Sequence, residues 1–288
     1  MSNKDLLDNI KRLREMTGVG FKDCKTALDE TQGDIEKSIE FLRKKGIAKA
    51  SKKMSRTASE GLALVKEDKG EVSIIEINSE TDFVAKNEDF INFCKELSEI
   101  NFISKSDINK INDTKMKNGI LVKDNLVNLI AKIGEKITIR RANFFDNSNG
   151  MNFFYVHSAI EKGIGKIISI VKIDGIIKSK NNDIGTKIAM HIAASNPLAV
   201  NQDGIDKNII EKELDIIKAE ITNSGKPAEM VEKISSGKIS KFLNDNSLLN
   251  QIWIMDSKKK VSDILKENSI DKPLKILNFV RYKVGEGV

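Results

Sequence analysis

The feature that most constrains the fold is a pair of apolar runs separated by a tight turn. The runs LALVKE and VSIIEIN flank the turn residues Asp68, Lys69 and Gly70. Apolar runs on either side of a short turn that contains glycine are typical of a β-hairpin. We therefore expect an antiparallel β-hairpin over these two runs.

The residues before this hairpin follow a helical period. Apolar side chains recur at intervals of three and four in three short stretches, and the glycines of MTGVG separate the first stretch from the second. Gly33 and Asp34 begin the third stretch, and we expect Gly46 to cap its C-terminal end. The pattern predicts a three-helix domain over residues 1–54, followed by the polar linker KASKKMSRTASE.

Helical and strand-like periods alternate after the hairpin. Asn87 is a suitable N-cap for a helix whose apolar stripe includes Phe90 and Leu97. The segment LVKDNLVNLIAKIG is helical as far as Gly134, and KITIRRANFF returns to a strand pattern. Residues 103–119 are polar and predict a loop or a frayed helix.

A second unit of strands and helices follows. FFYVHSAI and GKIISIVKI predict paired strands with EKG as their turn, and an apolar helix that contains His191 ends near Pro197. VSDILKENS and ILNFVRYKV predict a further helix and a closing strand. Between them lie two helical stripes joined by the turn NSGKP, and the first stripe has the spacing of a coiled-coil seam: Ile210, Leu214, Ile217 and Ile221.

These patterns predict an α+β protein whose second unit carries an inserted antiparallel helical hairpin. A protruding hairpin of this kind is also a candidate for self-association. The expected parts are the N-terminal domain at 1–54, core subdomain N at 55–143, core subdomain C at 144–204 and 244–288, and the hairpin, a coiled coil, at 205–243.

Enzymatic and cofactor chemistry finds little support in the sequence. His157 and His191 lie on different predicted elements, and no carboxylate or cysteine spacing near them resembles a metal site. GVG and GIG lack the third glycine of a dinucleotide loop, and SSGKIS has isoleucine where a phosphate loop needs serine or threonine. We therefore expect no catalytic residue, no cofactor and no metal, and a structural role for His191 on its apolar helix face.

The charge balance leaves a second class of function open. The formal net charge is +6, but 48 basic and 42 acidic residues are interleaved along the chain. Such charges are typical of a solvated surface, although the balance also suits a basic RNA- or ribosome-associated protein. Aromatic residues make up only 5% of the chain, which disfavours stacking on single-stranded nucleic acid.

The cysteines and the N-terminus favour a reducing, cytoplasmic compartment. Cys24 and Cys94 each fall on an apolar helical stripe, as buried free thiols do. The opening MSNKDLLDNIKRL lacks the apolar region of a signal peptide, and no stretch approaches the length that spans a membrane.

The stretch SETDFVAKNEDF directly follows the strand EVSIIEIN and places Phe83 in polar surroundings. One interpretation is that Phe83 inserts into another protein, where a fully buried ring would contribute about 1.5–3 kcal/mol. The other is that Phe83 folds back as a hydrophobic staple under the helix that begins near Asn87. The residues alone leave both interpretations open.

Several segments of the chain, taken in order, resemble one known family. MTGVGFKDCKTAL is similar to its N-terminal signature and ETDFVAKN to its most characteristic motif, and these are followed by AKIGEKITIRR, YVH, AMHIAASNP, EKE, SGKP and RYKVGEG. The ordered set resembles the bacterial elongation factor Ts family, the guanine-nucleotide exchange factors of elongation factor Tu, almost from end to end.

The resemblance implies a fold and a set of partner contacts. It implies a UBA-like N-terminal domain, a core of two related α+β subdomains and the inserted hairpin. It also implies binding to elongation factor Tu in its GDP-bound and nucleotide-free states, without nucleic acid or membrane. The implied contacts are Thr81, Asp82, Phe83 and Val84, which dislodge Mg²⁺ from the partner; Val19, Gly20 and Phe21 in the N-terminal domain; and His157 in core subdomain C.

The sequence departs from the family pattern at two places. Family members often have two bulky apolar residues after the second glycine of the TGxG turn, whereas here Phe21 is followed by Lys22. We expect that contact to be weaker or more electrostatic. Many members also continue past the GEG segment with a helix that touches the partner, and we expect no such contact from a chain that ends at Val288.

Overall fold

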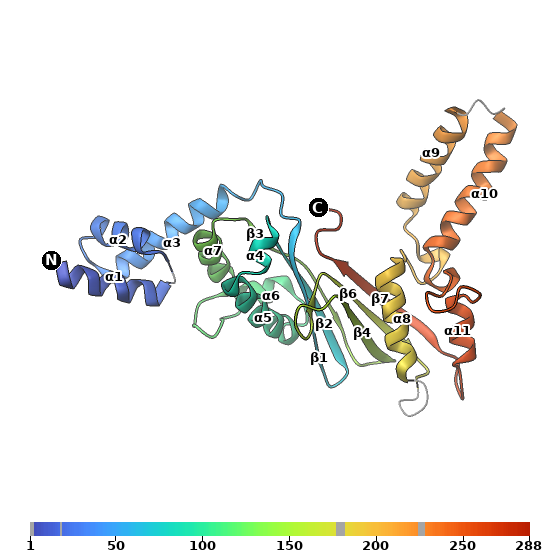
Figure 1. The fold of residues 1–288 in the computed structure, drawn as a ribbon, viewed down its shortest axis with the longest axis horizontal. Coiled ribbons are helices and arrows are strands. Elements are labelled where there is room, and N and C mark those ends of the chain that lie inside the picture. Colours follow the sequence, from blue (N-terminus) through green and yellow to red (C-terminus); the bar gives the residue numbers. More distant parts are fainter. Residues whose placement is uncertain (1–2, 18, 177–181, 224–227) are drawn as a thin grey trace.

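The computed structural model describes residues 3–17, 19–176, 182–223 and 228–288. The protein is elongated, with a helical bundle at one end, two sheets in the middle and a pair of long helices projecting at the other end (Figure 1). The described residues contain eleven α-helices and two antiparallel sheets. The predicted α+β class is therefore confirmed.

The N-terminal bundle consists of α1 (Asn3–Thr17), α2 (Phe21–Glu30) and α3 (Ile35–Ser51). Asp34 caps α3, since its carboxylate accepts a hydrogen bond from the Lys37 N–H at 3.0 Å. The bundle has a small apolar core of its own, separate from those of the sheets: Ile10, Leu13, Cys24, Ala27, Leu28 and Leu42.

Helix α3 does not end at Gly46, so the predicted cap at this position was wrong. The helix continues to Ser51 and packs against α7 (Val122–Ile133). A Cβ atom on Gly46 would lie 3.4 Å from Cγ1 of Val127 and 3.8 Å from Cβ of Ala131. These are ordinary van der Waals distances, so the packing of α3 on α7, and not the absent side chain, accounts for the longer helix. The first residues of the expected linker are helical.

The first sheet is built around the predicted hairpin. Strands β1 (Glu60–Asp68) and β2 (Glu71–Ser79) pair antiparallel through a two-residue turn in which Lys69 and Gly70 both have positive φ, 50° and 84°. Such a turn matches the right-handed twist of the flanking strands. The sheet order is β3-β2-β1-β5, with β3 (Ile137–Phe145) and the short β5 (Ile164–Gly165) at its edges.

Helices α5 (Glu88–Ile103), α6 (Ile108–Asp113) and α7 lie against the first sheet (Figure 1). Asn87 caps α5 as predicted, and its side chain accepts from the Asp89 and Phe90 N–H groups. The expected loop at 103–119 contains α6, because Asp107 caps this helix and Ile111 reaches the core. Short amphipathic helices of this kind give little periodic signal in the sequence.

The second sheet has the order β4-β6-β7, with strands Met151–His157, Ile167–Asp174 and Lys275–Lys283. Strands β4 and β6 pair as predicted, but the segment between them is more than a turn, since β5 leaves to join β1 in the first sheet. The outer face of the second sheet packs against α8 (Asn182–Ser195) and α11 (Val261–Glu267). Two 3-10 helices follow α8 in the chain, η1 (Gln202–Gly204) and η2 (Leu248–Asn250), and Leu248 of η2 belongs to the same apolar cluster. Both cysteines are buried free thiols, as predicted.

The two sheets share an apolar layer. Side chains of β1, β2 and β3 meet those of β6 and β7 in one buried cluster, to which Val65, Ile74, Phe145, Ile170 and Tyr282 contribute. The first sheet is therefore covered by helices on one face and by the second sheet on the other.

Helices α9 (Lys207–Asn223) and α10 (Ala228–Asn246) lie side by side and project from the second sheet (Figure 1). Ile217 and Ile221 of the predicted seam are buried, and Lys238 of α10 is paired with Glu220 of α9 at 2.7 Å. Most of the predicted turn NSGKP, residues 224–227, falls outside the described residues. Self-association of this pair stays a prediction.

A buried charge cluster joins the middle of β2 to the C-terminal segment. Glu76 of β2 is fully buried and accepts from Arg140 Nη1 at 3.0 Å, Arg141 Nε at 2.5 Å and the Gly285 N–H at 2.9 Å. A β-bulge opposite Glu76 makes Arg140 an extra residue, so two consecutive arginines face the same carboxylate. The Arg141 guanidinium also lies 4.2 Å from the ring centroid of Tyr282.

Burial alone would raise the pKa of Glu76, but the Gly285 N–H and the two guanidinium groups outweigh it, and the pKa lies below its ordinary value. At Tyr282 burial is the largest effect, and it raises the pKa of the phenol to about 12. Glu76 is therefore held as a carboxylate by its partners.

Replacing Glu76 with alanine is expected to lower the free energy of unfolding by about 3 kcal/mol or more, because two arginines lose their buried partner. Urea denaturation of the variant and the parent protein measures this difference. Glu60→Ala is the matched control, since Glu60 pairs with Lys166 at 2.7 Å where both side chains are partly exposed. That change is expected to cost less than about 1 kcal/mol, and equal effects of the two variants would contradict the role given to Glu76.

Candidate partner-binding site

The Phe83 side chain points into solvent and is 78% exposed. It belongs to α4 (Asp82–Ala85), a single helical turn directly after β2, and we call residues 80–86 the Phe83 loop. Val84 and Ala85 are buried in the core of the first sheet, so the same turn fixes one side in the protein and presents Phe83 on the other. The structure therefore rules out the hydrophobic staple in the free protein.

The loop is held at its base by two carboxylates that bond across to the opposite strand. Glu135 accepts from the Thr81 N–H at 3.0 Å through Oε2 and from the Thr81 hydroxyl at 2.8 Å through Oε1. In the other direction, Glu80 Oε1 accepts from the Lys136 N–H at 2.6 Å. Thr81 is therefore a fixed point of the loop.

Asp82, the acid beside Phe83, is paired within the loop. Its Oδ2 lies 2.7 Å from Lys86 Nζ, one helical turn later, and both side chains are largely exposed. The hydrogen bond from Lys86 holds the pKa of Asp82 below its ordinary value. The loop therefore presents an ion pair and an unpaired aromatic ring.

The predicted contacts of the N-terminal bundle lie where α1 turns into α2. Gly20 is the N-cap of α2, and Phe21 is 46% exposed at its first position. Val19 is half-buried against the bundle core, and its carbonyl accepts from the Cys24 thiol at 3.5 Å. Gly18, the first glycine of the GVG pair, is outside the described residues.

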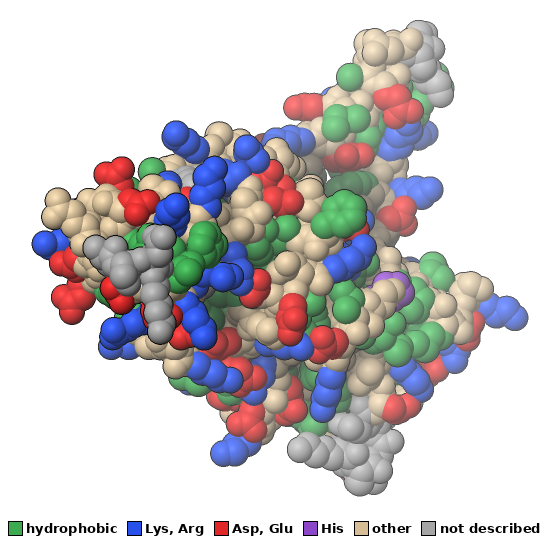
Figure 2. Space-filling view, turned by 60° about the vertical axis from the view of Figure 1, so that its left-hand side comes forward, with side chains coloured by type: hydrophobic (Ala, Val, Ile, Leu, Met, Phe, Trp, Pro, Cys, Tyr) green, Lys and Arg blue, Asp and Glu red, His purple; other side chains and the backbone are tan. Residues whose placement is uncertain are grey.

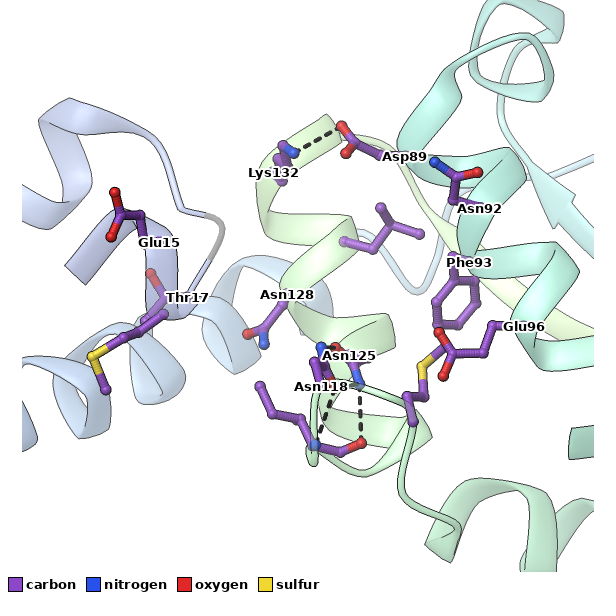
Figure 3. Close-up of a pocket in the computed structure, with 14 residues that line it drawn as sticks. Glu15, Thr17, Asp89, Asn92, Phe93, Glu96, Asn118, Asn125, Asn128 and Lys132 are labelled. Atoms are coloured by element: carbon purple, nitrogen blue, oxygen red, sulfur yellow. Dashed lines mark hydrogen bonds and ion pairs between the residues drawn. The ribbon is translucent and has the colours of Figure 1, made fainter. Parts of the chain in front are cut away.

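A cleft lies between the C-terminal end of α1 and the helices of the first sheet (Figure 3). It has a volume of about 350 Å³, and Glu15 and Thr17 of the bundle face Asn128 and Lys132 of α7 across it. Lys132 is paired with Asp89 of α5 at 2.8 Å. Among the described residues, no group of three or more histidine, cysteine, aspartate or glutamate side chains is arranged to hold a metal ion here or elsewhere.

His157 lies at the end of β4 with its ring exposed. The Tyr155 hydroxyl lies 3.3 Å from Nδ1 of this ring, and both residues line a hollow of about 460 Å³ together with Met255 and Arg281. His157 is therefore accessible at the rim of a largely apolar hollow in the second sheet.

His191 has the structural role predicted for it. Its ring is fully buried and stacks on Trp253 with centroids 5.2 Å apart. Nδ1 accepts from the Ile254 N–H at 3.4 Å and Nε2 lies 3.0 Å from Oε1 of Gln251, an arrangement that fits the neutral tautomer with the proton on Nε2. His191 thus fixes the segment that borders the hollow beside His157.

The predicted site residues belong to three separate parts of the molecule. Val19, Gly20 and Phe21 lie on the bundle, Phe83 and its neighbours beside the first sheet, and His157 on the second sheet. On the face shown in Figure 2, acidic and basic side chains are mixed, and the hydrophobic ones form small separate patches. This arrangement suits docking over a long surface. No described helix is long and apolar enough to cross a membrane.

Sequence reasoning missed Glu80, Glu135 and Lys136, which form the base of the Phe83 loop. The signal was present, because Glu80 directly follows β2 while Glu135 and Lys136 directly precede β3, and β2 pairs with β3. Residues just beyond the end of an antiparallel pair are close neighbours.

Fold and surface together define an α+β protein that presents an exposed aromatic ring on a fixed loop. The sequence comparisons narrow this class. The family described as Elongation factor TS matches residues 80–286. The protein named elongation factor Ts of Nitrobacter hamburgensis is 42% identical over 287 residues, and those of Zymomonas mobilis and Rickettsia felis are 40% and 38% identical over 282 and 283 residues. Each alignment covers 97% of this chain and 91–92% of the relative.

The chain belongs to the elongation factor Ts family, and it is a translation elongation factor. The resemblance carried by ETDFVAKN and the segments around it is therefore confirmed.

Burial lowers the pKa of His191 below its ordinary value of 6.5, against the opposing effect of its bond to Gln251. The unfolded chain therefore takes up a proton as the pH falls through about 6.5, before the folded protein does. The free energy of unfolding is expected to decrease from pH 7 to pH 5, as measured by urea denaturation at each pH. His191→Gln should weaken this dependence and His157→Gln should retain it; the reverse pattern would contradict the assignment.

Proposed function

We propose that this protein is a guanine-nucleotide exchange factor for elongation factor Tu and promotes GDP release from it during translation elongation. Family membership supports this function, and the exposed Phe83 ring on its fixed loop is the observation that carries it. Exchange requires no catalytic side chain on the factor, only a surface that binds one state of the partner more tightly than another.

The proposed mechanism acts on the partner's phosphate site. A GTPase holds GDP through backbone N–H groups and a Mg²⁺ ion that neutralise the phosphates. If the Phe83 ring enters between helices beside that site, the metal loses its coordination geometry and the phosphates lose part of their compensating charge. GDP then dissociates faster. By linkage, bound GDP lowers the affinity of elongation factor Tu for this protein by the same ratio by which this protein lowers its affinity for GDP.

Thr81, Asp82 and Val84 have different parts in this proposal. Thr81 anchors the loop, Asp82 with Lys86 forms its polar edge, and Val84 supports the turn from inside the core. The displacement of Mg²⁺ is therefore assigned chiefly to the ring of Phe83.

The remaining contacts hold the partner in place. The bundle, which we propose to be a UBA-like domain over residues 1–54, binds through Val19, Gly20 and Phe21. Core subdomain C, residues 144–204 and 244–288, docks on a different domain of the partner through His157 and the apolar hollow beside it. Core subdomain N at 55–143 carries the Phe83 loop, and α9 with α10 forms the inserted coiled-coil hairpin at 205–243.

Replacing Phe83 with alanine is expected to reduce the stimulated release of fluorescent GDP from elongation factor Tu by roughly 10- to 100-fold. This range follows from about 1.5–3 kcal/mol for burying the ring in the partner. Ile103→Ala is the matched control, because Ile103 is also 78% exposed but lies at the far end of α5. Ile103→Ala should exchange at the parental rate.

The rival class, an RNA- or ribosome-binding protein, makes a different prediction about salt. Binding through phosphates weakens steeply as the salt concentration rises, whereas an apolar ring in a pocket retains its affinity. A gel-shift series with RNA and a parallel binding series with elongation factor Tu, both at rising salt, separate the two. Tight RNA binding together with parental exchange by Phe83→Ala would favour the rival.

Deleting residues 1–54 is expected to leave a folded core with weak affinity for elongation factor Tu. The core keeps both sheets, and the bundle has its own apolar cluster. The core loses the α3–α7 contact, the Ala50 side chain, and the bonds of Lys53 and Met54 to Gly134 and Lys136. Circular dichroism checks the fold, and calorimetric titration with elongation factor Tu measures the affinity. Parental affinity in the truncated protein would remove the bundle from the proposed interface.

A further inference from the structure

The base of the Phe83 loop continues the sheet after the strands have ended. The last backbone pair between β2 and β3 joins Ser79 to Ile137. Beyond it, the N–H groups of Thr81 and Lys136 would have no ladder partner. Side-chain carboxylates take over this role, since Glu135 binds the Thr81 N–H and Glu80 binds the Lys136 N–H, each from the opposite strand.

The same base holds the segment that connects the bundle to the core. Glu80 Oε2 also accepts from Arg56 Nη1 at 3.1 Å, and Lys136 Nζ donates to the carbonyls of Met54 and Arg56, each at 2.8 Å. Lys53 Nζ donates to the Gly134 carbonyl. Three segments far apart in the sequence, residues 53–56, 80–81 and 134–136, therefore meet at one polar node.

Glu135 is the member of this node that acts on the loop itself. Its two oxygens bind two donors of one residue, Thr81, which immediately precedes the turn that carries Phe83. Two bonds from one carboxylate fix both the position and the orientation of Thr81. Ser79 adds a third restraint, because its hydroxyl donates to the Thr81 carbonyl at 3.0 Å.

Glu135 is not part of the apolar clusters that hold the fold together. It is half-buried at the surface, and its side-chain bonds to Thr81 end at the loop. Losing these bonds therefore loosens Thr81 and the start of the loop while the sheets stay packed. A change at Glu135 can thus alter the position of Phe83 without unfolding the protein.

We propose that Glu135 is a positioning residue for nucleotide exchange, which holds Phe83 at the angle from which its ring enters the partner. This inference rests on the proposed function and adds a residue that acts on the Phe83 loop through Thr81. A loop that is fixed in advance loses less conformational entropy when the ring is inserted. Glu135 thereby raises the rate of exchange at saturation and leaves the docking affinity to the other contacts.

The test compares Glu135→Ala, Glu135→Gln and Glu99→Ala in fluorescent-GDP release from elongation factor Tu, with the full chain titrated to saturation. Glu135→Ala is expected to lower the saturating rate about five- to tenfold and to leave the half-saturating concentration nearly unchanged. Glu135→Gln should recover most of the rate, because its amide can accept from the Thr81 N–H and donate to the Thr81 hydroxyl. Glu99→Ala, which removes an exposed carboxylate paired with Lys66, should match the parent.

A double variant shows whether Glu135 acts through the ring. In the Phe83→Ala background, Glu135→Ala should have little further effect, because no ring remains to be positioned. Full additivity of the two changes would overturn the inference. So would a parental saturating rate in Glu135→Ala, or a failure of Glu135→Gln to recover the rate.

Hydrogen exchange on the free protein separates this inference from the proposed function. Amides at 80–86 should exchange about tenfold faster in Glu135→Ala while those of β1 and β2 keep their protection. If the parent does not accelerate GDP release but the loop amides respond in this way, the proposed function fails and the anchoring stands. Unchanged loop exchange overturns the positioning role. If Glu135→Ala does not fold, Thr81→Val, which removes only the hydroxyl bond, replaces it with a smaller expected effect in each measurement.

Discussion

Strand β2 is the constraint on which the rest of the structure depends. From Val72 to Ser79 every residue of this strand is buried, and both of its edges are hydrogen-bonded, to β1 and to β3. Its two faces pack against helices and against the second sheet. A strand enclosed on all four sides has little freedom to shift, so the residues that leave its end start from a fixed position.

The chain uses carboxylates in two different ways around this strand. Glu76 is fully buried and charged, and two arginines and a backbone N–H compensate the cost of its burial. Glu80 and Glu135 lie nearer to solvent. They accept hydrogen bonds from backbone N–H groups that lie beyond the last paired residues of the sheet. The first arrangement joins the middle of β2 to the segment that follows β7, and the second determines where the following loop begins.

Much of the fold follows from local sequence signals. The Lys69-Gly70 turn, the Asn87 cap and the Gly134 helix end each lie where the sequence placed them, because each depends on one residue's backbone or side-chain preference. Gly46 shows the limit of this reasoning. Its sequence context is that of a helix end, but α3 continues through Gly46 and packs on α7, a tertiary contact that local signals do not encode.

The candidate site shows the same division. The sequence indicated Phe83 because it is an aromatic residue among polar ones. Its outward direction follows from the burial of Val84 and Ala85, which occupy the core side of the same helical turn. The bonds from Glu80 and Glu135 join residues more than fifty positions apart. Such pairs become visible only when the register of β2 and β3 is known.

The unbroken helix α3 makes the bundle an arm of fixed geometry. Because its C-terminal half lies along α7, with Arg43 bonded to Asp124 at 2.9 Å, the bundle and the first sheet do not diffuse independently. When the bundle or the first sheet has bound a target, the other part is already held at a fixed distance and angle from that target. The effective concentration of this second part at its own binding surface is therefore set by the geometry of the protein. The fixed distance between the bundle and the first sheet therefore favours targets whose two binding surfaces are separated by the same distance.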